Sequence, residues 1–167
     1  MDESPYLANR EHLIEKYGYL PLLGCEDRRY LELLLRFSKL RKYDMGEVIT
    51  LEGEYDNWVY ILLSGEVSVS KDEQELARID TPGDAFGEQV LIDYRPRSAT
   101  VEATADTICL AIDSSRISEL EEADRDKFNT VFFRLLAETL STKLRAVNQQ
   151  LLILQQALEE RDSKGKT

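Results

Sequence analysis

Glycines divide the middle of the chain, from Tyr43 to Asp113, into short runs rich in valine, isoleucine, threonine and tyrosine. β-branched and aromatic residues favour strands, and the glycines between them favour turns. Val67 and Val69 alternate with Ser68 and Ser70, the period of a strand that is buried on one face. We therefore predict strands at 48–51, 58–63, 66–70, 75–79, 98–103 and 107–112. Many short strands with little helix between them are typical of a closed antiparallel sandwich or jelly roll.

The segments on either side of this core have helical periodicity. Residues 5–42 are predicted to form two or three short amphipathic helices. The last of these helices has an apolar face, made of Tyr30, Leu31, Leu34, Leu35 and Phe37. Beyond the strands, we expect a short helical segment over 114–122 and a long helix from about 124 to 161.

These patterns divide the chain into four parts and define its fold class. They are an N-terminal helical segment (1–42), a jelly-roll core (43–113), C-terminal helices (114–161) and a tail (162–167). The predicted fold class is mainly β with flanking helices, an α+β arrangement.

The long C-terminal helix carries a heptad pattern. Two sets of mostly apolar residues recur every seven positions, offset by four: Phe133, Leu140, Val147 and Leu154, and Ala137, Leu144, Leu151 and Leu158. This a/d pattern predicts a coiled coil, and the alternative is an amphipathic helix that packs on its own domain. Because the predicted sheet is too short to cover four heptads, we predict a homodimer through residues 133–158.

Charge and composition limit the possible partners and chemistry. The 167 residues include 32 acidic and 21 basic side chains, and the net charge of −11 disfavours nucleic acid and anionic lipid as partners. The sequence starts without a basic stretch followed by an apolar one, and it has no uncharged run of about 18 residues. We therefore expect no signal peptide, no membrane span and a cytoplasmic location. Cys25, Cys109 and His12 are too few for a thiolate zinc site or for the histidine cluster of a cupin-like metalloenzyme. We therefore expect neither a metal nor an enzymatic activity.

The segment at 83–103, GDAFGEQVLIDYRPRSATVEA, carries the candidate ligand site. Gly87 and Glu88 introduce a short helical turn whose backbone N–H groups can contact an anion. Arg97 supplies one positive charge beside small residues. These features predict a clamp for one phosphate, with Glu88 accepting a hydrogen bond from a sugar hydroxyl.

Each of these two charged residues also has an interpretation that involves no ligand. Arg97 could form a salt bridge with a nearby acid such as Asp93 or Glu102. Glu88 could serve only as a negative charge at a helix N-terminus.

The stretch from Gly87 to Thr100 resembles the phosphate-binding cassette of the cyclic-nucleotide-binding domain family. Its Gly-Glu, its apolar pair, its Pro-Arg and its Ala-Thr have the spacing of that cassette. The likeness is to the regulatory domain of catabolite-activator-type proteins and to the regulatory subunits of cAMP-dependent protein kinase, and it covers roughly residues 27–150. It implies a jelly roll that binds a cyclic nucleotide, with cAMP favoured by prevalence in the family and cGMP as the alternative.

The resemblance also implies a role for each cassette residue. Arg97 would pair with the phosphate, and Glu88 would accept from the ribose 2′-hydroxyl. The implied ligand-binding residues are Gly87, Glu88, Gln89, Val90, Arg97, Ser98 and Ala99. The base would meet the C-terminal helix at Val147 and Asn148, and an asparagine can pair with either purine.

The leading interpretation is a non-enzymatic receptor without a cofactor. Binding of the nucleotide would change the position of the C-terminal helix in a homodimer. Only a short tail follows that helix, so we expect no DNA-binding domain and an output through an unknown protein effector. The alternative is a dimerising scaffold with a vestigial nucleotide pocket.

Overall fold

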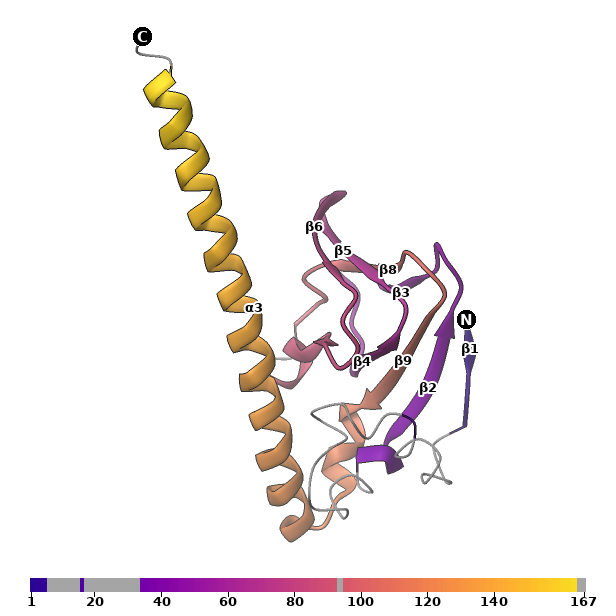
Figure 1. Ribbon diagram of the computed structural model, residues 1–167. Coiled ribbons are helices and arrows are strands. Elements are labelled where there is room, and N and C mark those ends of the chain that lie inside the picture. Colours follow the sequence, from indigo (N-terminus) through magenta and orange to yellow (C-terminus); the bar gives the residue numbers. More distant parts are fainter. Residues whose placement is uncertain (6–15, 17–33, 93–94, 165–167) are drawn as a thin grey trace. The chain divides into compact units, whose positions relative to one another are not determined.

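The computed structural model describes residues 1–5, 16, 34–92 and 95–164 (Figure 1). The chain divides into two compact units, Met1–Val131 and Phe132–Thr167. The strands all belong to the first unit, and most of the C-terminal helix forms the second.

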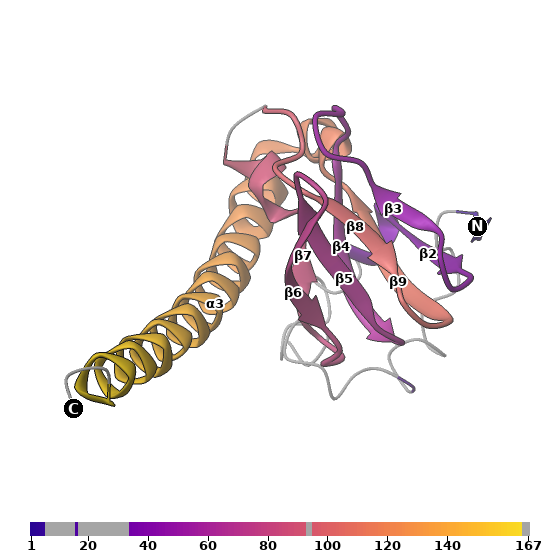
Figure 2. The same cartoon turned by 90° about the horizontal axis from the view of Figure 1, so that it is seen from above.

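Two antiparallel sheets build the first unit, and Figure 2 shows their strands from above. The larger sheet has the order β1 (Asp2–Glu3), β2 (Ser38–Tyr43), β9 (Thr107–Asp113), β4 (Trp58–Ser64) and β7 (Ala85–Phe86). The smaller has the order β3 (Val48–Thr50), β8 (Thr100–Ala103), β5 (Val67–Lys71) and β6 (Gln74–Ile79). This arrangement confirms the predicted antiparallel sandwich.

The core lies between the sheets and takes residues from both. β4 is a nearly continuous apolar run, and five of its seven residues, Val59 to Leu63, are buried. One buried cluster includes Tyr43, Tyr60, Leu62, Val67, Ile79, Phe86, Val101, Ala103, Cys109 and Ala111. Cys109 is fully buried, and this burial raises the pKa of its thiol to about 12.

The six predicted strands are confirmed with small shifts at their ends, but the helix prediction for 5–42 is wrong at its C-terminal end. Ser38–Tyr43 forms β2, which pairs with β9 along its whole length, from Ser38↔Ile112 to Tyr43↔Thr107. Pairing with a strand distant in sequence outweighs the local helical spacing there. β1 and β7 were not predicted, because two residues are too short for a periodic pattern.

Lys16 is described and helical, whereas residues 6–15 and 17–33 of the predicted N-terminal helices, with His12 and Cys25, lie outside the described residues. Leu34 and Leu35 are described, and they are helical and buried, as their place on the predicted apolar face requires.

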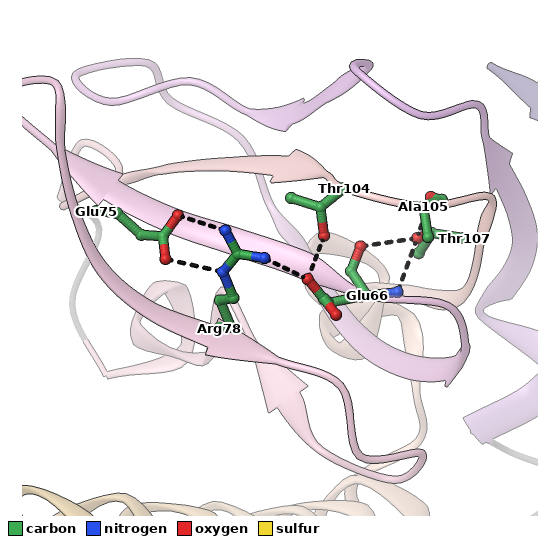
Figure 3. Close-up of polar contacts among 6 residues, drawn as sticks. All are labelled: Glu66, Glu75, Arg78, Thr104, Ala105 and Thr107. Carbon is green, nitrogen blue, oxygen red and sulfur yellow. Dashed lines mark hydrogen bonds and ion pairs between the residues drawn. The ribbon is translucent and has the colours of Figure 1, made fainter.

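A polar network connects neighbouring strands of the smaller sheet (Figure 3). Arg78 of β6 donates from Nε to Glu75 Oε1 at 2.8 Å and from NH1 to Glu66 Oε1 at 2.9 Å. Glu66 Oε1 also accepts from Thr104 Oγ1 at 2.7 Å. The network therefore ties the β5–β6 hairpin to the turn between β8 and β9.

Two helices follow the last strand, close to their predicted positions. They are a 3-10 helix, η2 (Ser114–Glu119), and a 43-residue helix, α3 (Glu122–Lys164). Many apolar residues of α3 are exposed in the structure, among them Phe133, Leu140, Leu144, Val147, Leu151, Leu152, Ile153 and Leu154. No helix within the described parts of the chain has the length and hydropathy that a membrane span requires.

Candidate functional site

Arg97 lies between η1 (Glu88–Leu91) and β8, and it is only 9% exposed. Its Nε donates to Asp56 Oδ2 at 2.7 Å, and its NH1 donates to the carbonyl oxygen of Gly87 at 2.8 Å. Its NH2 donates to Asp56 Oδ1 and to the carbonyl oxygen of Trp58. A guanidinium has five N–H donors, so these contacts leave one, on NH1, for a further acceptor.

The loop between β3 and β4 holds Arg97 through its main chain as well. The Arg97 N–H donates to the carbonyl oxygen of Glu54 at 2.8 Å, and the Gly53 N–H donates to the carbonyl oxygen of Arg97 at 2.9 Å. Asp56 is itself fixed, because its Oδ1 accepts from the Trp58 N–H at 2.7 Å. The guanidinium is thus oriented by a loop that lies some forty residues earlier in the sequence.

Asp56 is not one of the two acids, Asp93 and Glu102, that the sequence indicates as possible partners of Arg97. Asp93 lies outside the described residues, and the carboxylate that contacts Arg97 is that of Asp56. The only local signal is an Asp two residues before an apolar strand, which is typical of a turn. That signal does not reveal which distant residue the carboxylate faces.

Gly87 has a backbone conformation and a position that both favour glycine. Its φ is +73°, and a Cβ atom there would lie 2.6 Å from Arg97 NH1 and 3.1 Å from the carbonyl oxygen of Trp58. Any side chain at this position would therefore displace the guanidinium. Glycine lets the main chain approach Arg97 closely enough for its carbonyl to accept a hydrogen bond.

The other cassette residues lie on either side of this contact. Glu88 begins η1 and is 6% exposed, whereas Gln89 is exposed and Val90 is half-buried. After Arg97, Ser98 is exposed and Ala99 is half-buried. Among the cassette residues, the structure brings Gly87 and Arg97 into direct contact through the hydrogen bond described above.

The two residues predicted to meet a base belong to the second unit. Val147 and Asn148 are both exposed on α3, and their contact with a ligand stays a prediction. Within the parts of the chain that the structure describes, no group of three or more His, Cys, Asp or Glu residues could hold a metal ion.

Comparison with known proteins identifies the family. Residues 40–124, about half of the chain, match the family described as "Cyclic nucleotide-binding domain". The cGMP-dependent protein kinase of Plasmodium berghei is 31% identical over 126 residues, which cover 73% of this chain and 14% of that protein. The cAMP-dependent protein kinase regulatory subunit of Yarrowia lipolytica is 32% identical over 103 residues, with 62% of this chain and 27% of that protein covered. The chain thus spans only a small part of these relatives.

Solved structures agree with this identification. A cyclic nucleotide-binding domain from Methylobacillus flagellatus has a TM-score of 0.74 at 22% identity, with 90% of this chain and 88% of that chain covered, and this likeness shows the fold. The catabolite activator protein of Thermus thermophilus has a TM-score of 0.61 at 27% identity, with 80% and 62% covered. Both the resemblance and the jelly roll predicted from the sequence are confirmed. The chain belongs to the cyclic nucleotide-binding domain family.

Proposed function

We propose that this protein is a cyclic-nucleotide receptor, with cAMP as its ligand, that acts as a regulatory module without catalytic activity. The observation that carries the proposal is the oriented guanidinium of Arg97, which is buried and hydrogen-bonded to the Gly87 carbonyl within the cassette. A buried arginine with a donor to spare suits a single phosphate charge. The relatives include kinases named for cGMP and regulatory subunits named for cAMP, so cGMP is the alternative ligand.

In this proposal Arg97 pairs with the phosphate oxygens. The Ser98 hydroxyl and the backbone N–H groups of Gln89, Val90 and Ala99 add donors, and Glu88 accepts from the ribose 2′-hydroxyl. The exposure of Ser98 and Gln89 leaves both residues accessible to a ligand.

The C-terminal helix supplies the response and the dimer contact. Residues 133–158 form a coiled coil between two copies, and Val147 and Asn148 contact the base. Exposed apolar residues at the heptad positions, such as Leu144 and Leu151, support this part of the proposal. A ligand that contacts both the cassette and the helix would favour one helix arrangement and so signal to a protein effector.

The test of the receptor proposal is calorimetry with cAMP and with cGMP. We expect cAMP to bind with the lower Kd. A Kd above about 1 mM for both nucleotides would contradict the receptor and favour the second candidate, a dimerising scaffold with a vestigial pocket. The exposed apolar residues of α3 are the observation that favours this candidate.

The dimer is tested separately by light scattering at micromolar concentration. We expect a dimer for the wild type and a monomer for Leu144→Lys, which puts a charge at a heptad position. The matched control is Gln149→Lys, which adds the same charge at an exposed position outside the pattern and should stay dimeric. A monomeric wild type would refute the coiled coil.

A further inference from the structure

A second arginine, Arg41 of β2, is as deeply buried as Arg97, at 9% exposed. Its NH1 donates to the Tyr60 hydroxyl at 2.9 Å, and its guanidinium carbon lies 3.9 Å from the centroid of the Trp58 ring. Both aromatic residues belong to β4. The guanidinium of Arg41 is thus held in the sandwich by an aromatic ring and a hydroxyl.

Both aromatic neighbours of Arg41 connect it to the proposed phosphate site, which comprises Gly53, Asp56, Gly87 and Arg97. The main chain of Trp58 accepts from Arg97 NH2 and donates to Asp56, while its ring lies under Arg41. The Tyr60 ring stacks on Phe86 with 5.1 Å between centroids, and Phe86 directly precedes Gly87. Two short routes therefore connect Arg41 to Arg97, one through each aromatic residue.

The counter-ion of Arg41 comes from the N-terminal strand. Glu3 of β1 is opposite Arg41 in the sheet, and its Oε2 accepts from Arg41 Nε at 2.6 Å. Its Oε1 accepts from Lys39 Nζ at 2.6 Å. Burial acts to raise the pKa of Glu3, but the hydrogen bonds from Lys39 and Arg41 outweigh it and lower the pKa. Glu3 is thus held as a carboxylate against β2.

β1 is suited to undock as a unit because it is only two residues long and lies at the edge of its sheet. Besides the ion pairs of Glu3, its attachment includes the Ser4 N–H, which donates to the Leu40 carbonyl oxygen at 2.9 Å. Short edge segments with few contacts open locally at small free energies.

We propose that Arg41 is a positioning residue that couples the docking of β1 to the phosphate site. When Glu3 is docked, Arg41 is held against Trp58 and Tyr60, and these residues support the contact between Arg97 and Gly87. When β1 undocks, Arg41 loses its carboxylate and this support weakens. Because coupling between two sites is reciprocal, a bound nucleotide also stabilises the docked strand. The stabilisation of the docked strand by a bound nucleotide rests on the proposed function, whereas the coupling of β1 to Arg97 and Gly87 does not.

The ligand-free half is tested by amide hydrogen exchange on the full chain. Glu3→Gln removes the charge of the counter-ion with little change of shape. We expect it to speed exchange at the amides of Gly53 and Arg97, which form the hydrogen bonds of the phosphate site, by about 3- to 30-fold. The matched control is Glu75→Gln, which breaks an arginine–carboxylate pair elsewhere in the first unit and should leave both rates unchanged.

One exchange result would overturn the proposal. If Glu3→Gln speeds exchange at Ser4, so that β1 is released, but leaves the amides of Gly53 and Arg97 at wild-type rates, then docking is not coupled to the site. Arg41→Lys is a second variant, since it keeps the charge but cannot reproduce the guanidinium contacts, and it should speed the same two amides.

The reciprocal half is tested with cAMP. Saturating cAMP should slow exchange at Ser4, and Glu3→Gln should raise the Kd for cAMP by about 3- to 30-fold, while Glu75→Gln leaves it unchanged. Binding without any effect at Ser4 or of Glu3→Gln would overturn the coupling. If the wild type binds neither cAMP nor cGMP, the proposed function fails, and the exchange at Gly53 and Arg97 still decides the coupling of β1 to the site.

Discussion

Two arginines of the sandwich have similar partners but very different surroundings. Arg97 forms a bidentate pair with Asp56, and Arg78 forms one with Glu75. The side chains of the first pair are 8% and 27% exposed, whereas those of the second are 54% and 50% exposed. Figure 3 shows that Arg78 also reaches Glu66. Of these two similar ion pairs, one therefore lies largely inside the fold and the other at its surface.

The difference in burial determines what each pair can do. Water and salt screen an exposed pair, which contributes little to stability and attracts a ligand anion weakly. In the interior, charges interact more strongly, and a charge that loses its partner is destabilising. Arg97 is also paired with a single carboxylate, that of Asp56, whereas Arg78 lies between two carboxylates, those of Glu75 and Glu66. On these grounds Arg97 is suited to bind an anion, and Arg78 is suited to hold strands together.

The largest expected effect is that of Arg97→Ala on nucleotide binding. Removing the ion pair with a buried phosphate should weaken binding by about 2 to 5 kcal/mol, since the phosphate is left without its counter-charge. Calorimetry with cAMP measures this change. Arg97→Lys keeps the charge but lacks the fork that meets Gly87 and Asp56 together, so it should recover only part of the loss. A wild-type affinity for Arg97→Ala would refute the site.

Gly87→Ala should have the next largest effect. The new Cβ would lie 2.6 Å from Arg97 NH1, so the guanidinium has to move, and we expect binding to weaken on the order of tenfold. The control is Gly46→Ala, which has a similar positive φ, +88°, but no neighbouring atom within 4 Å. Both variants should lose roughly 1 to 2 kcal/mol of stability from the left-handed backbone. Equal nucleotide affinities in the two variants would contradict a specific effect at Arg97.

Asp56→Asn tests whether this half-buried carboxylate orients Arg97 or competes with the ligand for it. We expect binding to weaken by roughly threefold to tenfold, because misorientation of the guanidinium outweighs the removal of a competing negative charge. Calorimetry at fixed ionic strength measures the Kd. Glu54→Gln removes the same charge from an exposed side chain of the same loop and should leave the Kd unchanged. Tighter binding by Asp56→Asn would instead mean that Asp56 acts as a competitor.

The sequence was informative where the determinants are local. The strands follow from alternation and glycine turns, and the cassette follows from residues within one stretch, Gly87 to Thr100. The contact between Gly87 and Arg97 could be expected because only ten positions separate them. Local order therefore predicted the strands of the core and indicated Arg97 as the candidate ligand-binding residue.

The contacts that could not be predicted join distant parts of the chain. Asp56 reaches Arg97 because a loop pairs with it through two main-chain hydrogen bonds, and no pattern near Asp56 encodes that pairing. Ser38–Tyr43 has a spacing that suits either a helix or a strand, and its partner β9 lies about seventy residues later. The contact between Glu3 and Arg41 is also long-range. It forms because β1 pairs with β2, and no pattern near Glu3 predicts that pairing. Sequence periodicity indicates which face of a strand or helix is buried, but it does not identify the distant residues that pack against that face.

The smallest expected effect is that of Arg78→Gln. The substitution breaks the bonds to Glu75 and Glu66, but because all three side chains are substantially exposed, the Kd for cAMP should stay within about twofold of wild type. The hydrogen bond from Arg78 lowers the pKa of Glu75 below its ordinary value of 4.5, and the variant should return that pKa toward 4.5 in an NMR titration. A lowered carboxyl pKa contributes stability above its unfolded value and loses it as the pH falls through the folded value, so the stability difference between variant and wild type should shrink below about pH 4.5. If Arg78→Gln instead weakened cAMP binding as much as Asp56→Asn does, burial would not be what separates the two arginines.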